Sequence, residues 1–306
     1  SYFDKLFNNK FSDKKINIKN SNIFVKDVAG ETVSITQISK SFIFYDELKL
    51  LNKIFLKGEI FKIPFILEID KDLIGKENKN IINSKKYKIK LKNNSIKKNE
   101  IINGLNNLSI LNLKLITKYN LKDELLSFKS LNSQVLNSKI DYEGKLNLKP
   151  FNLIIDMSSQ KINIKILFNN SSILLELIKS KKLFHENLNI AISLNSSNIT
   201  NSNILDSIKI NFNAINGEID LNKSYVLSNK IGLLKSDQSR LFIDNDNLFF
   251  NGNFDLNVKN SNHFFSFFQT PKKYKKSIKN ISFDLNFNFF KNKLTKKDFK
   301  IDKKKP

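Results

Sequence analysis

The stretch GEIFKIPFILEID, residues 58–70, returns as GKLNLKPFNLIID at residues 144–156. In the first copy every second residue is apolar: Phe61, Ile63, Phe65, Leu67 and Ile69. The positions between them are largely polar and include Lys62, Pro64, Glu68 and Asp70. Successive side chains of a strand point to opposite sides, so this alternation gathers the apolar residues on one face. The repeated stretch predicts a strand whose sheet has one buried and one wet side.

The same alternation recurs along most of the chain. It is clear at residues 87–91, 111–115, 162–168, 188–194 and 281–289, and the links between such segments are rich in Asn, Ser and Asp. Short polar links suit tight turns between antiparallel neighbours. The pattern therefore predicts an all-β, mostly antiparallel fold built on a long twisted sheet. A shorter echo, NGEIDLN at 216–222 and NGNFDLN at 251–257, also indicates repeated supersecondary units.

The second copy changes its phase at a proline. Leu146 and Leu148 carry the apolar alternation before Pro150, whereas Phe151 and Leu153 carry it afterwards. Proline cannot donate to a strand ladder and is confined to edges, bulges and strand starts. We expect a bulge or a bend at Pro150 that re-aims the apolar face while the sheet continues.

Three segments depart from the alternation. Residues 171–184 place apolar side chains at helical spacing behind possible serine caps and predict an amphipathic helix. Residues 261–271 predict a single short, very apolar turn or helix, with Ser261 or Asn262 as a possible cap and Pro271 as a stop. Residues 72–84 show no clear period and are interpreted as a loop.

The charge of +23 suggests nucleic acid, but the composition argues against it. Arg240 is the single arginine among 52 basic residues, whereas phosphate and base recognition favour the guanidinium group. Asparagine and isoleucine are abundant while glycine and proline are scarce, as A+T-rich codon usage would produce. The lysines are therefore interpreted mainly as a product of codon supply. The chain has no cysteine, and no stretch reaches the ~20 apolar residues of a membrane-spanning helix.

Candidate catalytic groups are few. His185 and His263 are not at metal-ligand spacing, and Asp70 and Asp156 sit at strand ends, where aspartate usually caps a turn. The sequence has no phosphate-binding loop or nucleophile elbow. We therefore expect no catalysis, no metal and no cofactor.

The sequence leaves three possibilities for what the apolar faces contact. They could close on one another in a sandwich or barrel core, face lipid in an outer-membrane barrel, or line an open trough. Lysines inside the strands and the absence of tryptophan disfavour the membrane barrel. Composition does not separate the trough from the sandwich.

The segment from Asn17 to Ile69 resembles the repeating unit of the AsmA-like family, which belongs with TamB to the AsmA/TamB superfamily. The glycine and Pro-Phe positions match it twice, at Gly58, Pro64 and Phe65 and again at Gly144, Pro150 and Phe151. NGEIDLN, NGNFDLN and TPKKYKKSIKNISFDLNF, residues 270–287, resemble the end of short family members. The resemblance implies one elongated domain over residues 1–306. Its repeats would cover approximately residues 12–84, 85–170 and 185–306, around a helix near 171–184.

This resemblance implies a non-catalytic, periplasmic protein that carries phospholipids in an open apolar groove and serves outer-membrane biogenesis. An N-terminal helix, absent from this sequence, would tether it to the inner membrane. Its partners would be phospholipid acyl chains and the inner and outer membranes, without specific nucleic acid. The lining residues would be Phe61, Ile63, Phe65, Leu67, Ile69, Phe151, Leu153, Ile155, Met157, Phe283, Leu285 and Phe287. The alternative is an assembly factor that binds outer-membrane proteins by strand addition.

Overall fold

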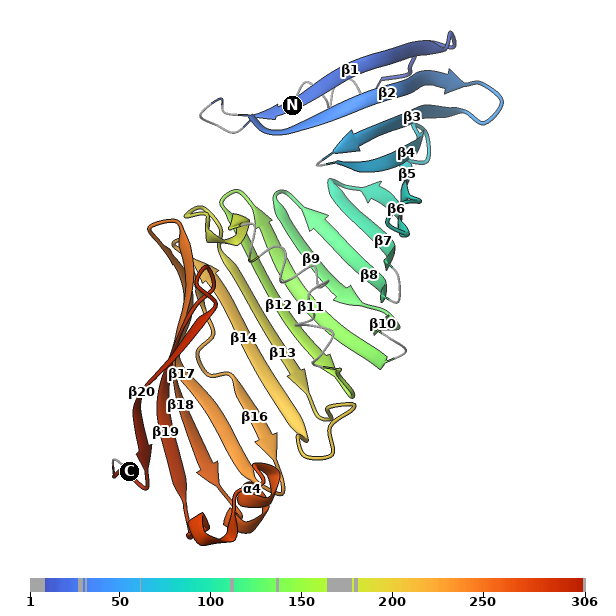
Figure 1. Ribbon diagram of the computed structural model, residues 1–306. Helices are drawn as coiled ribbons and strands as arrows, with labels where there is room; N and C mark the ends of the chain where they lie inside the picture. The colour runs from blue at the N-terminus through green and yellow to red at the C-terminus, as the bar shows by residue number, and fades with distance from the viewer. Residues whose placement is uncertain are drawn as a thin grey trace. The chain divides into compact units, whose positions relative to one another are not determined.

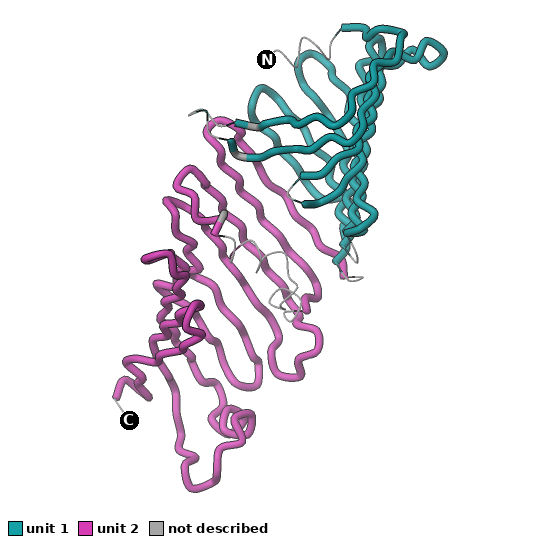
Figure 2. The backbone as a smooth tube through the Cα atoms, turned by 45° about the horizontal axis from the view of Figure 1, so that its top comes forward, with its two compact units in different colours: residues 1–137 teal, residues 138–306 magenta. Residues whose placement is uncertain are grey.

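The computed structural model describes residues 9–26, 30, 32–60, 62–110, 113–135, 138–163, 178 and 181–304. The chain divides into two compact units, unit 1 with residues 1–137 and unit 2 with residues 138–306 (Figure 2). Most described residues of both units lie in strands, and nearly all strand pairs are antiparallel (Figure 1). The predicted all-β, mostly antiparallel class is confirmed.

Unit 1 is a meander whose strands pair in chain order. Its strands are β1 (Ile16–Lys26), β2 (Thr32–Asp46), β3 (Leu51–Ile60), β4 (Ile63–Asp72), β5 (Glu77–Ser84), β6 (Ile89–Lys98), β7 (Ile101–Ile110), β8 (Leu113–Lys122), β9 (Leu125–Ser130) and β10 (Ser133–Val135). Both β9 and β10 pair with β8. Between them the buried Ser133 hydroxyl accepts a hydrogen bond from the Ile116 N–H (2.9 Å) and donates one to the Ile116 carbonyl (3.1 Å), so it bridges the interruption.

Unit 2 contains one parallel strand pair in an otherwise antiparallel arrangement. Its elements are β11 (Ser138–Leu148), β12 (Phe151–Ser159), η1 (Lys182–Phe184), β13 (Ile190–Ser196), β14 (Ser207–Ile215), β15 (Glu218–Asp220), β16 (Tyr225–Ser228), β17 (Gly232–Asp244), β18 (Asn247–Val258), α4 (Ser261–Phe267), η2 (Lys272–Tyr274), β19 (Asn280–Asn288) and β20 (Lys293–Ile301). β12 and β13 are the parallel pair. Parallel neighbours need a long crossover, and the connection between these strands supplies it.

The repeated stretch is a hairpin and not one strand, which corrects the first prediction. In the first copy β3 ends at Ile60, β4 begins at Ile63, and these two residues are register partners across a two-residue loop. Lys62 in this loop has a positive φ of 61°. Residues i and i+3 across such a loop share a face, so the apolar positions change from even numbers in β3 to odd numbers in β4.

The second copy folds in the same way with its loop placed differently. Leu148 and Phe151 are register partners, and Lys149 and Pro150 form the two-residue loop between β11 and β12. The phase change at Pro150 is therefore a chain reversal and not a bulge or a bend in a continuing strand. Pro64, the matching residue of the first copy, lies inside β4 opposite Glu59.

Two further predictions change. The predicted loop at 72–84 contains β5, which is formed because β4 and β6 pair with it on both sides. A short helix forms within 261–271 as α4, but it ends at Phe267, before Pro271, and its N-cap is Asn260 in place of Ser261 or Asn262. Of the predicted helix at 171–184, residues 171–177 and 179–180 lie outside the described residues, Ile178 is helical, and Lys182–Phe184 form η1.

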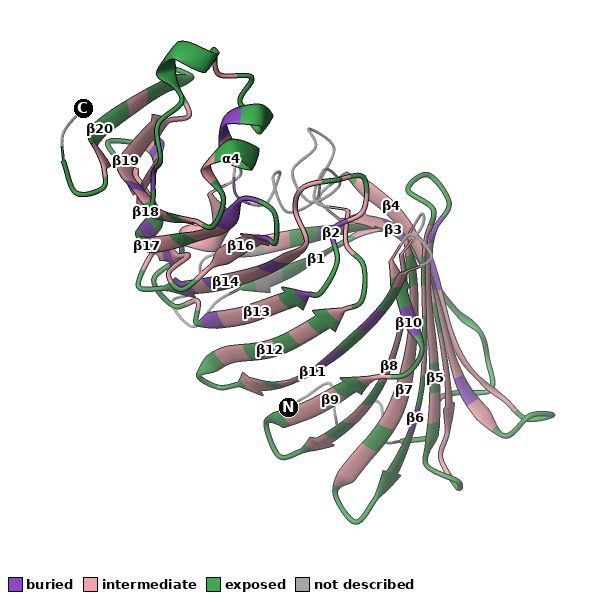
Figure 3. Ribbon diagram, turned by 90° about the horizontal axis from the view of Figure 1, so that it is seen from below, coloured by how far each residue is buried: buried purple, intermediate pink, exposed green. Residues whose placement is uncertain are grey.

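The fully buried apolar cores of the two units are small. Figure 3 shows that many strand residues are of intermediate exposure. Among the described residues of unit 1, the buried apolar side chains are Ile38 and Leu56. Unit 2 has one cluster around Ile190, Ala214 and Ile219 and a second that consists of Phe265, Ile278 and Ile281. The described residues of unit 1 thus form a single sheet layer, whereas unit 2 has a partial cover.

Candidate functional site

An unbroken apolar row crosses six strands of unit 1. Residues that are direct register partners point to the same side of a sheet. The row runs through such partners from β3 to β8: Leu56, Leu67, Ile82, Leu91, Leu108 and Leu115. At ~4.8 Å between strands it is roughly 24 Å long. This side is called the apolar face of unit 1.

The apolar face continues toward one end of the strands and becomes polar toward the other. Ile89, Ile110 and Leu113 form a second apolar row beside the first. On the other side of the first row lie Asn80, Asn93 and Asn106, which are register partners in β5, β6 and β7. The face therefore carries a row of three amides in β5, β6 and β7 beside its apolar rows.

The opposite face of unit 1 carries lysines. These exposed side chains alternate with the apolar rows along the same strands: Lys57, Lys79, Lys90, Lys92, Lys118 and Lys129. Charged groups stay hydrated, so this side faces water. The single sheet layer is consequently amphipathic, with positive charge on one face and hydrocarbon on the other.

One described segment approaches the apolar face of unit 1 at the start of β3. The Asn52 amide, 2% exposed, accepts a hydrogen bond from the Phe11 N–H (2.9 Å) and donates one to the Asn9 carbonyl (2.8 Å). Nearby, the Lys10 Nζ lies 4.2 Å from the centre of the Tyr45 ring. The buried amide is thus paired with backbone on both of its atoms, which fixes residues 9–11 at this end.

Unit 2 also has a row of apolar register partners on one face of its strands, and this row is longer. Its register partners cross nine strands: Leu146, Leu153, Ile190, Ala214, Ile219, Leu241, Phe250, Phe287 and Leu294. At ~4.8 Å per strand the row is roughly 38 Å long. The side that carries this row is called the apolar face of unit 2.

The apolar face of unit 2 is covered in its middle. Ile178, Leu183, Phe184 and Leu188, all from the crossover between β12 and β13, pack on the cluster around Ile219. The Lys181 ammonium donates hydrogen bonds to the Asp246 carbonyl and carboxylate, which ties this connection to the turn between β17 and β18. The cover explains why Ala214 and Ile219 are fully buried.

The predicted lining residues fall on these two faces. Ile63, Phe65, Leu67 and Ile69 of β4 share the apolar face of unit 1, and Phe61 lies outside the described residues. On the apolar face of unit 2 lie the other seven: Phe151, Leu153, Ile155, Met157, Phe283, Leu285 and Phe287. Sequence reasoning missed Ile82, Leu91, Leu108 and Leu115 as members of one row, because cross-strand register was unknown. Of these, Ile82 was assigned to a loop.

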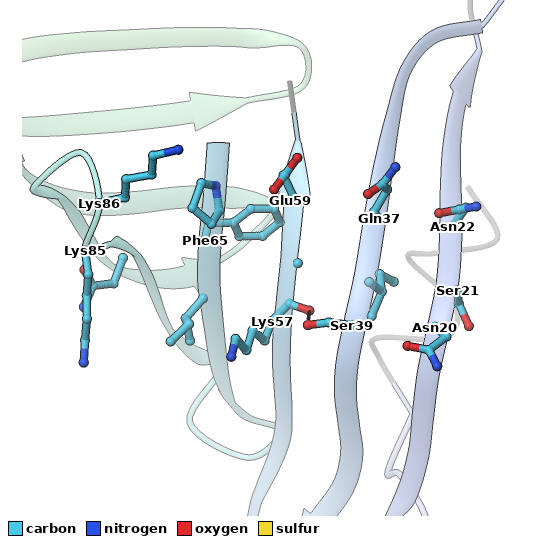
Figure 4. Close-up of a pocket in the computed structure, with 15 residues that line it drawn as sticks. Asn20, Ser21, Asn22, Gln37, Ser39, Lys57, Glu59, Phe65, Lys85 and Lys86 are labelled. Atoms are coloured by element: carbon cyan, nitrogen blue, oxygen red, sulfur yellow. Dashed lines mark hydrogen bonds between the residues drawn. The ribbon is translucent and has the colours of Figure 1, made fainter. Parts of the chain in front are cut away.

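A pocket of about 790 Å³ lies where the ladder between β2 and β3 is interrupted (Figure 4). Ile38 pairs with Gly58 and Lys40 with Lys57, which leaves Ser39 as a bulge whose hydroxyl donates to the Lys57 carbonyl at 2.9 Å. Its walls include Glu59 and lysines as well as Phe65 and Pro64. By register, Lys57, Glu59 and Pro64 belong to the lysine-bearing side of the sheet, whereas Ile38 and Phe65 belong to the apolar face, so residues of both faces line this pocket.

The described titratable groups have structural surroundings. The His185 Nδ1 accepts a hydrogen bond from the Asn187 N–H (3.2 Å), and Lys53 lies 3.8 Å from the Asp70 carboxylate. Hydrogen bonds from the backbone N–H groups of Lys279 and Asn280 hold the pKa of Asp302 below its usual value. In the part of the chain that the structure describes, no three His, Asp or Glu residues gather as a metal site would need.

No protein-family model matches this chain, and no curated protein or solved structure matches it. The resemblance to the AsmA-like family therefore stays a prediction from the motifs. Among the described residues, no helix is both long and apolar enough to cross a bilayer.

Proposed function

We propose that this protein binds phospholipid acyl chains on the apolar faces of its two units and moves phospholipids between membranes without catalysis. The observation that carries the proposal is the row of six apolar residues from Leu56 to Leu115 on a single sheet layer. Ile82, Leu91 and Leu108, in the middle of this row, are each partly exposed. An uncovered apolar row on a protein surface indicates a binding site for an apolar ligand.

The dimensions suit an acyl chain. One leaflet of a bilayer has about 15 Å of hydrocarbon, so a row of roughly 24 Å accommodates the length of one chain. Each CH₂ group that leaves water contributes about 0.8 kcal/mol. Similar side chains repeat at every strand, so a bound chain can slide along the row through states of similar free energy.

The cellular setting is proposed from the motif resemblance. A protein of this kind would act in the periplasm, tethered to the inner membrane, and would contribute to phospholipid transport and outer-membrane biogenesis. The amide ladder of Asn80, Asn93 and Asn106 gives polar lipid atoms a hydrogen-bonding surface beside the hydrocarbon row.

The alternative proposal is an assembly factor that adds a strand to an outer-membrane protein. Among the named strands, β1 pairs only with β2, and β20 pairs only with β19. β20 carries Lys293, Lys296, Lys297 and Lys300, and lysines on an edge discourage strand addition. The edge of β1 is the better candidate for such pairing.

Photo-crosslinking tests the lipid proposal with neighbouring positions as matched controls. A benzophenone side chain at residue 91 or 108 faces the apolar row, whereas one at residue 90 or 107 faces the lysine-bearing side. After incubation with phospholipid vesicles, mass spectrometry should find lipid adducts at 91 and 108 and few at 90 and 107. Equal capture on both faces, or capture of protein alone at 91 and 108, would refute the proposal.

A further inference from the structure

The connection between β18 and β19 forms a rigid support for an exposed aromatic group. The Asn260 side chain caps α4 by accepting two backbone N–H hydrogen bonds (2.9 and 3.1 Å). The Ser261 hydroxyl donates to the Ile278 carbonyl (2.9 Å) and accepts from its N–H (3.0 Å), which closes the connection. Phe265 is buried with Ile278 and Ile281. The helix is therefore held at its N-terminal end and through its buried side.

Three aromatic side chains of this connection point away from the core. Phe267, Phe268 and Tyr274 are 48%, 59% and 60% exposed. The Phe268 ring lies 4.8 Å from the rings of both Phe264 and Phe267, so the rings form one group. A single exposed phenylalanine is ordinary, whereas a contiguous exposed aromatic group on a fixed support indicates a binding surface.

The same connection is strongly basic. It carries six lysines and no acidic residue between Asp255 and Asp284: Lys259, Lys272, Lys273, Lys275, Lys276 and Lys279. Four of them immediately follow α4, and the Lys273 Nζ lies 4.9 Å from the centre of the Tyr274 ring. The Asp302 carboxylate reaches this segment from elsewhere in the chain and accepts hydrogen bonds from the backbone N–H groups of Lys279 and Asn280. The connection that carries the aromatic group thus has a net positive charge.

We propose that α4 and residues 271–276 form a docking site for the surface of an anionic phospholipid bilayer. Phe267 and Phe268 enter the boundary between head groups and acyl chains, and Tyr274 lies at the head-group level. The lysines contact the anionic head groups. Basic residues beside exposed aromatic side chains are the combination that binds membrane interfaces. The docking site goes beyond the acyl-chain faces and does not depend on them.

A bilayer fits this surface better than nucleic acid does. The Phe267 and Phe268 rings meet edge to face at 77°, and the Phe264 and Phe268 rings are tilted by 51°, so the group offers no flat platform on which successive bases could stack. The segment also has no arginine for bidentate contacts to phosphate or bases. Hydrocarbon, in contrast, accommodates rings in any orientation.

A tryptophan probe tests the insertion directly, because the chain contains no tryptophan. Phe267→Trp places the probe in the aromatic group. Phe290→Trp is the matched control, since Phe290 is 80% exposed in the turn between β19 and β20. With vesicles of phosphatidylcholine and phosphatidylglycerol, the emission of the first variant should shift to the blue and be quenched by brominated acyl chains. The control emission should not change. Unshifted emission from Phe267→Trp in the presence of bound vesicles would overturn the proposal.

Vesicle sedimentation tests the two parts of the site separately. The Phe267→Ser/Phe268→Ser variant should bind anionic vesicles about tenfold more weakly than the unchanged chain. At about 0.5 M salt, where charges are screened within a few Å, the unchanged chain should keep part of its binding to vesicles, whereas the variant should lose all of it. The control Phe290→Ser should bind like the unchanged chain. Equal binding by both variants would overturn the proposal. Leu108→Asp, which alters the apolar face of unit 1, should still sediment with vesicles, so failure of lipid capture and failure of docking are distinguishable.

Discussion

Tyr119 lies directly across Gly104, and its hydroxyl donates a hydrogen bond to the Asn93 Oδ1 at 2.9 Å. The tyrosine thus starts from β8, crosses β7 over a residue that has no side chain, and reaches β6. A methyl group at residue 104 would overlap the ring. Three strands of the apolar face are tied together because one of them has a glycine at the crossing point.

This relationship predicts that Gly104→Val destabilises the protein by about 1–3 kcal/mol, because the ring must leave its site. Tyr119→Phe should cost less, about 0.5–1.5 kcal/mol, since it removes one hydrogen bond and keeps the ring. Chemical denaturation followed by circular dichroism measures both. Lys118→Ala, on the opposite exposed face, is the control. Equal stability of Gly104→Val and the unchanged chain would contradict the described packing.

Truncation should separate the covered row from the uncovered one. Ile219 is fully buried beneath the crossover of unit 2, whereas Leu108 is half-buried on the uncovered face of unit 1. We expect Ile219→Ala to lower the free energy of unfolding by about 2–5 kcal/mol, because the substitution leaves a cavity. Leu108→Ala should cost only about 1–2 kcal/mol, because little surrounds the lost atoms. If Ile219→Ala and Leu108→Ala lower the free energy of unfolding by similar amounts in the same urea titration, a layer must cover Leu108.

The Asp302 carboxylate makes stability depend on pH. Its pKa is lowered because the backbone N–H groups of Lys279 and Asn280 stabilise the charged form. A lowered folded-state pKa contributes stability that is present above the ordinary value of about 3.9 and is lost as the pH falls through the folded value. Asp302→Asn should therefore lower the melting temperature at pH 7.

The melting temperatures of the unchanged chain and Asp302→Asn should converge as the pH falls below about 3.9. Asp255→Asn, at an exposed strand position, serves as the control. A melting-temperature difference that stays constant from neutral to acidic pH would show that the carboxylate charge plays no part.

The lysine-rich faces predict weak and sequence-independent binding of nucleic acid. Phosphate contacts release counterions, so such binding should weaken steeply as salt rises and be lost by about 200 mM. Fluorescence anisotropy with two unrelated oligonucleotides measures this. Tight binding that persists at that salt concentration, or a strong preference for one sequence, would favour a nucleic-acid function over the lipid proposal.

The period-two pattern predicted the amphipathic strands correctly but placed a strand where a hairpin reverses. In the second copy the apolar positions change from Leu148 to Phe151, and this change is the mark of a two-residue loop, whose flanking residues pair and share a face. In the first copy Phe61 continued the alternation and concealed the loop. The echoes at 216–222 and 251–257 also differ. Asn216 and Gly217 form a turn with positive φ angles, whereas Asn251 and Gly252 lie within β18.

β5 was missed because its polar residues break the alternation on the apolar face. Asn80 points to the same side as Ile82, so the residues of β5 on this face do not form a continuous apolar pattern in the sequence. The strand forms because the backbones of β4 and β6 pair with it, which is a tertiary cause that local sequence does not carry. The cap of α4 was also decided by a tertiary contact. The Ser261 hydroxyl is hydrogen-bonded to Ile278, and Asn260 caps the helix.

The sequence by itself determined that the strands are amphipathic, because alternation of side chains follows from the local geometry of an extended backbone. It also determined that the polar faces are rich in lysine. The tertiary structure alone decided which residues form a row, since Leu91 meets Leu108 only through the register of two strands. It also decided that Ile219 is covered while Leu108 is not. Burial depends on which other segment packs above a residue, and that segment can be distant in sequence, as Ile178 is from Leu241.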